Sequence, residues 1–378
     1  MNDINQVTAA LDRKDYKQAA QLLKQLQKES PQNPWVQFYI GRYYELTNKL
    51  ESAEKIYRQL LRDTTTPKIV TQTRQAIQRL ETIEQNRRQD AIALSKNDPR
   101  NAEPGLLILE PVSTENKTAV IQNISRILKI DPYTARMQIQ SRGWRLYKTG
   151  AIGELRVYGE ELLSAGIPVF WATFSDIQKI QVFRVQYFQS LIPQPTVVCE
   201  NNLDQLGSLT FNWSEVSQRV EGLLPLFMEV MDYSPHRRNE KFRHKEITQD
   251  YAQICDLHLP GRQCILRLCD QTYQFQKGFT AETAKQSDIK NSIKTQKSQS
   301  TARINWNNLL ETFNQKLPVP IWSEFTPFAE TALDYTQMLG RIKSHIDLDR
   351  KSETPWDATF QLYSGLVFLK SQGDQTHS

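Results

Sequence analysis

Three cysteines and a histidine fall within one short stretch, CDLHLPGRQCILRLCD, at residues 255–270. Cysteine and histidine side chains bind zinc, and a thiolate can also act as a nucleophile or a redox group. The spacing is C-x2-H-x5-C-x4-C, which differs from the paired knuckles of structural zinc sites. Three hypotheses follow: a metal site, a reactive thiol, or two strands that use cysteine as a small apolar residue.

The dipeptide at 260–261, Pro-Gly, predicts a two-residue turn between two strands that pairs Leu259 with Arg262. Successive side chains of a strand point to opposite faces, so the pair has two distinct faces. One face carries Cys255, Leu257, Leu259, Cys264, Leu266 and Leu268, and the other carries Asp256, His258, Gln263, Ile265, Arg267 and Cys269. Since the candidate ligands are divided between the faces, we predict cysteines in the apolar core and no metal site.

A polar group remains on the outer face of this predicted hairpin: Asp256, His258, Arg267 and Asp270. It is interpreted either as a solvent-exposed cross-strand charge cluster or as a patch that contacts a ligand or partner. An enzyme centred on His258, Asp256 and Asp270 is one functional hypothesis. The chain contains no phosphate-binding loop, H-E-x-x-H or G-x-S-x-G motif, so the sequence predicts no catalytic residue and no cofactor.

The composition is that of a globular protein with room for about two to four domains. Of 378 residues, 39% are hydrophobic and 24% are charged, and the 14 glycines favour helices over turn-rich β structure. The net charge of +5 does not indicate a dedicated nucleic-acid binder. The N-terminus lacks the pattern of a signal peptide, and no apolar run approaches the roughly 20 residues of a membrane span. We therefore expect a cytoplasmic protein without a disulfide framework.

A repeat with a period of 34 residues occupies the N-terminus. It superimposes DYKQAAQLLKQLQKESPQNP on KLESAEKIYRQLLRDTTTP and so aligns Tyr16 with Leu50, Ala19 with Ala53, Leu23 with Tyr57 and Leu26 with Leu60. Over residues 1–67 this pattern resembles the tetratricopeptide repeat (TPR), in which small residues allow two antiparallel helices to pack closely. Gly41 and Ala53 would be those small residues. Arg87 breaks the third period, so residues 66–95 are predicted to form one long capping helix.

The resemblance to TPR proteins also implies a binding site. In that family the first helix of each repeat lines a concave groove that binds a peptide or a partner helix. The corresponding positions here are Trp35, Phe38, Arg42 and Glu45, with Thr8 and Leu11 from the first repeat. The alternative is that Trp35 and Phe38 pack against the capping helix, because aromatic side chains are common both at interfaces and in cores.

Residues 106–175 predict a small α/β domain. Strand and helix patterns alternate in the order β-α-α-β-α-β, with Asp131 as the N-cap and Pro132 at the first position of the second helix. This order, the segments VIQNISRIL, YTARMQI and EELLSAGIPV, and Lys148 resemble the C-terminal domain of the bacterial ribosomal stalk protein over residues 107–173. The stalk family binds translation factors through a turn rich in glycine and lysine. That turn reads LKIDPYTAR here, so the resemblance implies the fold and not the factor binding.

Alternation of period two predicts strands after residue 180, and amphipathic helices return after residue 304. The second of these helices would place Tyr335, Met338, Leu339, Ile342 and Ile346 on one face. Between the strands lies the basic run HRRNEKFRHK, 236–245, whose Arg237, Arg238, Lys241, Arg243 and Lys245 form a candidate patch for an anionic partner. A nucleic-acid-associated or ribosome-associated protein is therefore the alternative functional hypothesis.

The sequence thus predicts a multidomain α+β protein. Its parts are a TPR-like helical region (1–97), a linker (98–105), a small β-α-α-β-α-β domain (106–175), an antiparallel β-rich domain (176–279), a polar linker (280–303) and a C-terminal helical region (304–378) that packs on the β-rich domain or stands alone. The predicted function is that of a non-enzymatic adaptor or assembly factor. It would bind a peptide or helix of another protein through the TPR-like groove, and neither the partner nor the oligomeric state follows from the residues.

Overall fold

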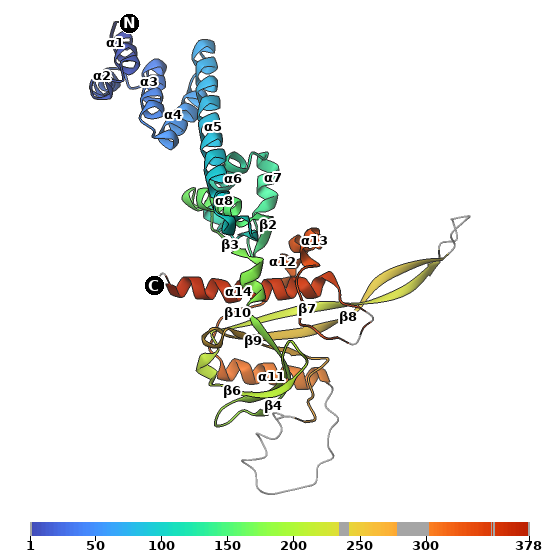
Figure 1. The fold of residues 1–378 in the computed structure, drawn as a ribbon. Coiled ribbons are helices and arrows are strands. Elements are labelled where there is room, and N and C mark those ends of the chain that lie inside the picture. Colours follow the sequence, from blue (N-terminus) through green and yellow to red (C-terminus); the bar gives the residue numbers. More distant parts are fainter. Residues whose placement is uncertain (1, 234–241, 278–301, 349, 351, 377–378) are drawn as a thin grey trace. The chain divides into compact units, whose positions relative to one another are not determined.

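The computed structural model describes residues 2–233, 242–277, 302–348, 350 and 352–376 (Figure 1). The chain divides into two compact units, residues 1–97 and residues 98–378. The first unit is entirely helical, and the second combines two sheets with helices. This arrangement is the multidomain α+β class that the sequence predicts.

Five helices form the first unit: α1 (Asn2–Asp12), α2 (Tyr16–Glu29), α3 (Pro34–Leu46), α4 (Leu50–Asp63) and α5 (Pro67–Ser95). Consecutive helices pack as the hairpins α1/α2 and α3/α4, and α5 packs against both α3 and α4. Side chains cap the helices where the sequence turns: Asp15 accepts a hydrogen bond from the backbone of Gln18, and Asn33 accepts one from Trp35. The single long helix predicted after the second repeat is confirmed.

The crossing of α3 and α4 depends on Gly41. A Cβ atom at this position would lie 2.4 Å from Cε1 of Tyr57, a side chain that is fully buried. Ala53 is likewise fully buried, so both predicted small residues lie where the helices approach each other. The apolar positions predicted for α5 face the same core, with Ile69, Ala76 and Leu80 buried and Ile77 and Ile83 partly buried.

The second unit begins with a small antiparallel sheet of strand order β2-β1-β3. Its strands are β1 (Pro104–Leu109), β2 (Arg145–Ala151) and β3 (Val169–Thr173), and its helices are α6 (Lys117–Leu128), α7 (Pro132–Gln138) and α8 (Ile152–Ser164). The predicted order β-α-α-β-α-β is therefore confirmed. Asp131 accepts hydrogen bonds from the backbone of Tyr133 and Thr134, as an N-cap does.

A larger sheet follows, with seven strands among the described residues in the order β10-β7-β8-β9-β4-β5-β6. The strands are β4 (Gln181–Ser190), β5 (Thr196–Glu200), β6 (Leu206–Thr210), β7 (Gln218–Tyr233), β8 (Phe242–Leu259), β9 (Cys264–Cys269) and β10 (Ile321–Trp322). The β4–β9 and β10–β7 pairs are parallel, and the other pairs are antiparallel. Most strand pairs are thus antiparallel, as the sequence predicts, and the two parallel pairs make the sheet mixed.

Helices cover both faces of the large sheet. Helix α11 (Ala302–Lys316) contributes Trp306, Leu309 and Phe313 to the core on one face. Helices α12 (Phe325–Ala332) and α14 (Pro355–Thr376) contribute to the core on the other face, and α14 lies beside β7 (Figure 1). The C-terminal segment after residue 304 therefore packs on the β-rich sheet.

The predicted helix over residues 334–346 is wrong. Only the short helices η5 (Leu333–Tyr335) and α13 (Thr336–Leu339) form there, and Gly340 follows the last helical residue. Ile342 and Ile346 lie outside any helix but are still buried in the same core as Leu339. Their apolar spacing therefore predicted correctly that they are buried and incorrectly that they belong to a helix.

The two sheets of the second unit share one core. Leu106, Ile108, Trp144 and Leu146 of the small domain join Val220, Leu224, Ala252 and Ile254 of the large sheet in a cluster closed by α12 and α14. Helix α9 (Phe174–Gln178) follows β3 and contacts α14 through Ile177, against which Gly365 packs closely. The described residues of 98–378 consequently form one compact unit, rather than a chain of separate modules.

Candidate protein-interaction surface

The first helices of the two hairpins and the capping helix pack in a row, because α3 contacts both α1 and α5. Four of the six predicted groove residues lie on α3, where a spacing of three or four residues places them along one side of the helix. The side chains of α3 therefore determine what this surface presents to a partner.

Two of the predicted groove residues belong to the core instead. Phe38 is 5% exposed, with its ring centroid 5.8 Å from that of Tyr57, and Leu11 is 2% exposed. Phe38 packs with residues of α4 and α5, and Leu11 packs with residues of the first hairpin and with Val36 of α3. The assignment of Phe38 and Leu11 to an accessible groove is thus wrong, because neighbouring helices cover them.

Trp35 is partly exposed and held in a defined orientation. Its ring packs edge-on against Phe38 with a centroid distance of 6.1 Å, and Nζ of Lys68 lies 5.8 Å from its centre. The latter distance is that of a cation–π contact. The ring of Trp35 is therefore held in place by its contact with the buried Phe38, while part of its aromatic surface remains accessible.

Arg42 and Glu45 carry opposite charges one turn apart on the same helix. Arg42 lies 3.7 Å from Asp12 of α1, and its side chain is 37% exposed. Glu45 accepts hydrogen bonds from the hydroxyl of Tyr57 at 2.9 Å and from Nε of Arg79 at 3.0 Å. Burial and the adjacent carboxylate raise the pKa of Tyr57, and the hydrogen bond to Glu45 raises that of Arg79, so Glu45 is held by one neutral and one charged donor.

We call this set the α3 surface: Trp35, Arg42, Glu45, Asp12 and Arg79. Asp12 and Arg79 are not among the residues that the repeat pattern predicts for the groove, although Arg79 lies 34 residues after Glu45, one full repeat later. Applying the same period to the polar positions would have found it. Thr8, the remaining predicted residue, is partly buried and donates its hydroxyl hydrogen bond to the carbonyl of Ile4 within α1.

Three of the four residues in the polar group predicted for the outer face of the hairpin are buried. Asp256 and His258 have no exposed surface and Arg267 is 3% exposed, because α14 covers this face of the sheet. Nε and Nη2 of Arg267 donate to the carboxylate of Asp256 at 2.9 and 2.7 Å. Nε2 of His258 lies 2.9 Å from the hydroxyl of Ser364 on α14. The expectation of an exposed cluster is therefore wrong.

Asp270 does not belong to this buried group. Its carboxylate accepts a hydrogen bond from the backbone of Gln253 at 2.9 Å, and no contact joins it to His258. The candidate acid-base set of His258, Asp256 and Asp270 is thus not brought together, and its first two members do not reach solvent. Burial lowers the pKa of His258 to about 4, so its imidazole is neutral.

The strands of the hairpin are joined differently from the prediction. A turn of 3-10 helix, η4 (Pro260–Arg262), is followed by Gln263 with a φ of 50°, so Leu259 pairs with Cys264. The predicted register, which paired Leu259 with Arg262, is wrong by two residues. A shift of two preserves the faces, so the division of the side chains is correct.

All four cysteines are buried and free, which confirms the prediction of core cysteines. Cys199, Cys255 and Cys264 pack in the core under α11, and Cys269 packs in the core under α14. Burial raises the pKa of Cys264 to about 11, which keeps its thiol protonated. No group of three or more His, Cys, Asp or Glu side chains within the described part of the chain could hold a metal ion.

The basic run at 236–245 lies largely outside the described residues. This applies to Arg237, Arg238 and Lys241, and also to the side chains of Arg243 and Lys245, whose backbone belongs to β8. The predicted polar linker also falls outside the description over residues 280–301. Among the helices that are described, none combines the length and apolar character needed to cross a membrane.

Comparison with known proteins identifies one region of the chain. Residues 10–69 match the family model of the tetratricopeptide repeat. No curated protein and no solved structure matches the chain, so the resemblance of residues 107–173 to the ribosomal stalk protein is not confirmed. The match and the two packed helical hairpins agree, and such repeats are modules of protein–protein interaction. The N-terminal region of this chain is a tetratricopeptide-repeat-like region.

Proposed function

We propose that the protein is a non-enzymatic adaptor or assembly factor that binds a peptide or helix of a partner protein through its TPR-like region. The observation that carries this proposal is the α3 surface, where Trp35 and Arg42 remain accessible beside the buried core of the repeats. Tryptophan and arginine are the residue types that most often dominate the energy of protein interfaces.

The contacts of these two side chains suit them to binding. Trp35 is already oriented by Phe38 and Lys68, so little side-chain entropy is lost when a partner covers it. Arg42 and Asp12 form a long, exposed pair, and such pairs contribute little to stability. Arg42 is therefore free to exchange Asp12 for a carboxylate of the partner. Glu45 is held in place by Tyr57 and Arg79, and its carboxylate supplies a hydrogen-bond acceptor one turn from Arg42.

The test is affinity purification of the full-length chain with quantitative mass spectrometry. The double variant Trp35→Ala/Arg42→Ala removes both anchors. Arg58→Ala on α4 is the matched control, because Arg58 is an exposed arginine that pairs with Glu54 of its own helix. We expect a partner to be recovered with the wild type and the control, and at least about tenfold less with the double variant, a loss of the size that follows from removing hot-spot residues.

The partner found in this way is then titrated in purified form against the same three proteins. Circular dichroism confirms that the double variant retains its helices. The proposal is contradicted if the double variant recovers as much partner as the wild type does. It is also contradicted if a chain that lacks residues 1–97 recovers as much partner as the wild type.

A further inference from the structure

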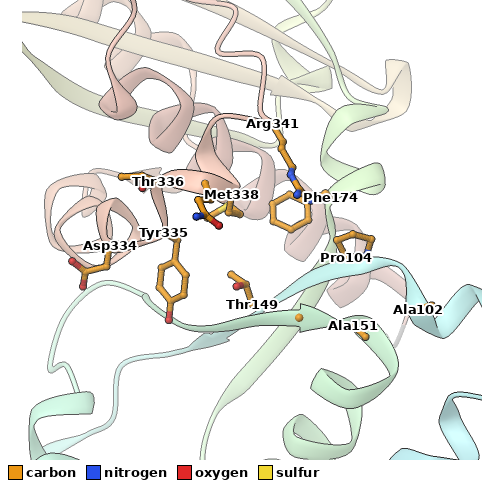
Figure 2. Close-up of a pocket in the computed structure, with 12 residues that line it drawn as sticks. Ala102, Pro104, Thr149, Ala151, Phe174, Asp334, Tyr335, Thr336, Met338 and Arg341 are labelled. Carbon is orange, nitrogen blue, oxygen red and sulfur yellow. The ribbon is translucent and has the colours of Figure 1, made fainter.

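A cavity of about 530 Å³ lies in the second unit, between the edge strand β2 and residues 334–341 (Figure 2). Thr149, Gly150 and Ala151 of β2 form one wall, and Phe174, Met338 and Arg341 form the opposite side. Ligand pockets typically have volumes of about 300–1,000 Å³. The TPR-like region contributes no residue to this cavity.

The wall formed by β2 is the edge of a sheet, since β1 is the one described strand that pairs with β2. Side chains cover the first part of this edge. The backbone N–H of Leu146 donates to the hydroxyl of Thr331 at 3.2 Å, and the hydroxyl of Tyr335 donates to the carbonyl of Tyr147 at 2.7 Å. Neither Thr331 nor Tyr335 extends this protection to the residues that follow.

The part of the β2 edge that no described side chain covers begins at Thr149. The backbone N–H of Ile152 donates to the carbonyl of Glu103, just before β1. The backbone N–H of Ile152 therefore points towards β1. Backbone groups alternate in direction along a strand, and Thr149 therefore faces away from β1. Its outward N–H and C=O find no hydrogen-bond partner among the described residues, and they border the cavity. An unpaired strand edge of this kind accepts an extended peptide as an additional strand.

The two ends of the cavity differ in charge. Asp334 precedes Tyr335 and lies near the Tyr147 end of β2. Arg341 lies at the other end, because its carbonyl accepts from Gln178 on α9, the helix that starts at Phe174 directly after β3. Arg341 is exposed, and its guanidinium makes no ion pair or hydrogen bond with any described residue.

We propose that this cavity binds the C-terminal end of a polypeptide in an extended conformation. The peptide backbone pairs with Thr149, its terminal carboxylate binds Arg341, and its last apolar side chain packs against Phe174 and Met338. A guanidinium matches the planar, bidentate geometry of a carboxylate. With the carboxylate at Arg341, the peptide runs parallel to β2, and a basic side chain near its start meets Asp334.

The test measures binding of defined peptides to the full-length chain by fluorescence anisotropy. The probe is a labelled pool of four-residue peptides with lysine first, Val, Ile, Leu or Phe at the other positions, and a free C-terminal carboxylate. A second pool of the same composition ends in an amide. We expect the amide pool to bind at least about tenfold more weakly, because it cannot form the charged pair with Arg341.

Two variants assign the effect to the cavity. Arg341→Gln is expected to reduce binding of the free-acid pool to the level of the amide pool. Arg142→Gln, which changes another exposed arginine of the same unit outside the cavity, leaves the difference between the pools unchanged. In parallel, hydrogen exchange of the Thr149 amide slows when the free-acid pool is bound, because a peptide strand then occupies that N–H.

Equal binding of the two pools, unchanged binding to the Arg341→Gln variant, or unprotected exchange at Thr149 each overturns the proposal. Absence of binding at about 1 mM peptide, a concentration at which weak recognition is still detected, overturns it as well. All of these readouts concern residues 98–378 and are independent of whether the α3 surface binds a partner.

Discussion

The hydroxyl of Ser364 donates a hydrogen bond to the carboxylate of Asp256 at 2.6 Å and joins α14 to the centre of the large sheet. Asp256 also accepts two hydrogen bonds from Arg267, whose third donor bonds the carbonyl of Ser344 at 2.5 Å. The ring of Phe360 lies 5.1 Å from the guanidinium of Arg267. This charged face of the sheet can be buried because each charged group is paired and hydrogen-bonded within the core.

Removing Asp256 should therefore strongly destabilise the second unit. The variant Asp256→Ala leaves the guanidinium of Arg267 buried without its counter-charge, and we expect the free energy of unfolding to fall by roughly 3–5 kcal/mol. Urea denaturation followed by fluorescence measures the change. The matched control is Arg262→Ala, which breaks an exposed pair with Glu215 and keeps the capping hydrogen bond from Asn212 to Glu215. Exposed pairs contribute less than about 1 kcal/mol. Similar losses in the two variants would show that the buried pair is not held as described.

The stability of the second unit should fall as the solution becomes acidic, because His258 is buried in its neutral form. Burial lowers its pKa to about 4, an effect that the charge of Arg267 reinforces and that of Asp256 opposes. In the unfolded chain histidine has a pKa of about 6.5. Between these two values the unfolded state binds more protons, so stability is fully present above pH 6.5 and decreases towards pH 4. The contribution of His258 to this loss is roughly 3 kcal/mol.

Denaturation at pH 7.5, 5.5 and 4.5, one value above both pKa values and two between them, checks this expectation. The variant His258→Gln removes the titration of this residue and should flatten the pH dependence. A smaller slope remains, since burial also lowers the pKa of His345 to about 4. An unchanged slope in the His258→Gln variant would refute the assignment of the acid sensitivity to this imidazole.

Gly41 should tolerate no side chain. The variant Gly41→Ala places a methyl group against the ring of Tyr57, which is enclosed by α3, α4 and α5 and cannot move aside freely. Overpacking of this kind costs about 1–3 kcal/mol, and we expect faster hydrogen exchange in α3 and α4. The matched control is Gly207→Ala, where the added methyl meets open space. If both variants exchange at the wild-type rate, the close helix crossing is absent in solution.

The local features of this fold are predictable from the sequence, and the long-range ones are not. The helical hairpins follow from a 34-residue period and from small residues such as Gly41, all within neighbouring segments. The faces of the β8–β9 hairpin are also predictable, because side chains alternate even when the register is wrong by two. The burial of Asp256 and His258 is not, since α14 covers them from about a hundred residues further along the chain.

The same distinction applies to the candidate sites. Trp35 and Arg42 follow from positions within a repeat. Thr149 could not be singled out, because its significance depends on where Tyr335 stops covering the edge of β2. A free strand edge is a property of the surrounding elements, and no residue type indicates it.

The shared core of the second unit also dictates an order of events during synthesis. Trp144 and Leu146 emerge from the ribosome long before Phe328 and Tyr363, the residues against which they are finally enclosed. Until α14 has been translated, the early sheet exposes an apolar face that is liable to aggregate or to recruit a chaperone. A nonsense mutation that deletes α14 would thus uncover Trp144 and Leu146, which lie more than two hundred residues upstream.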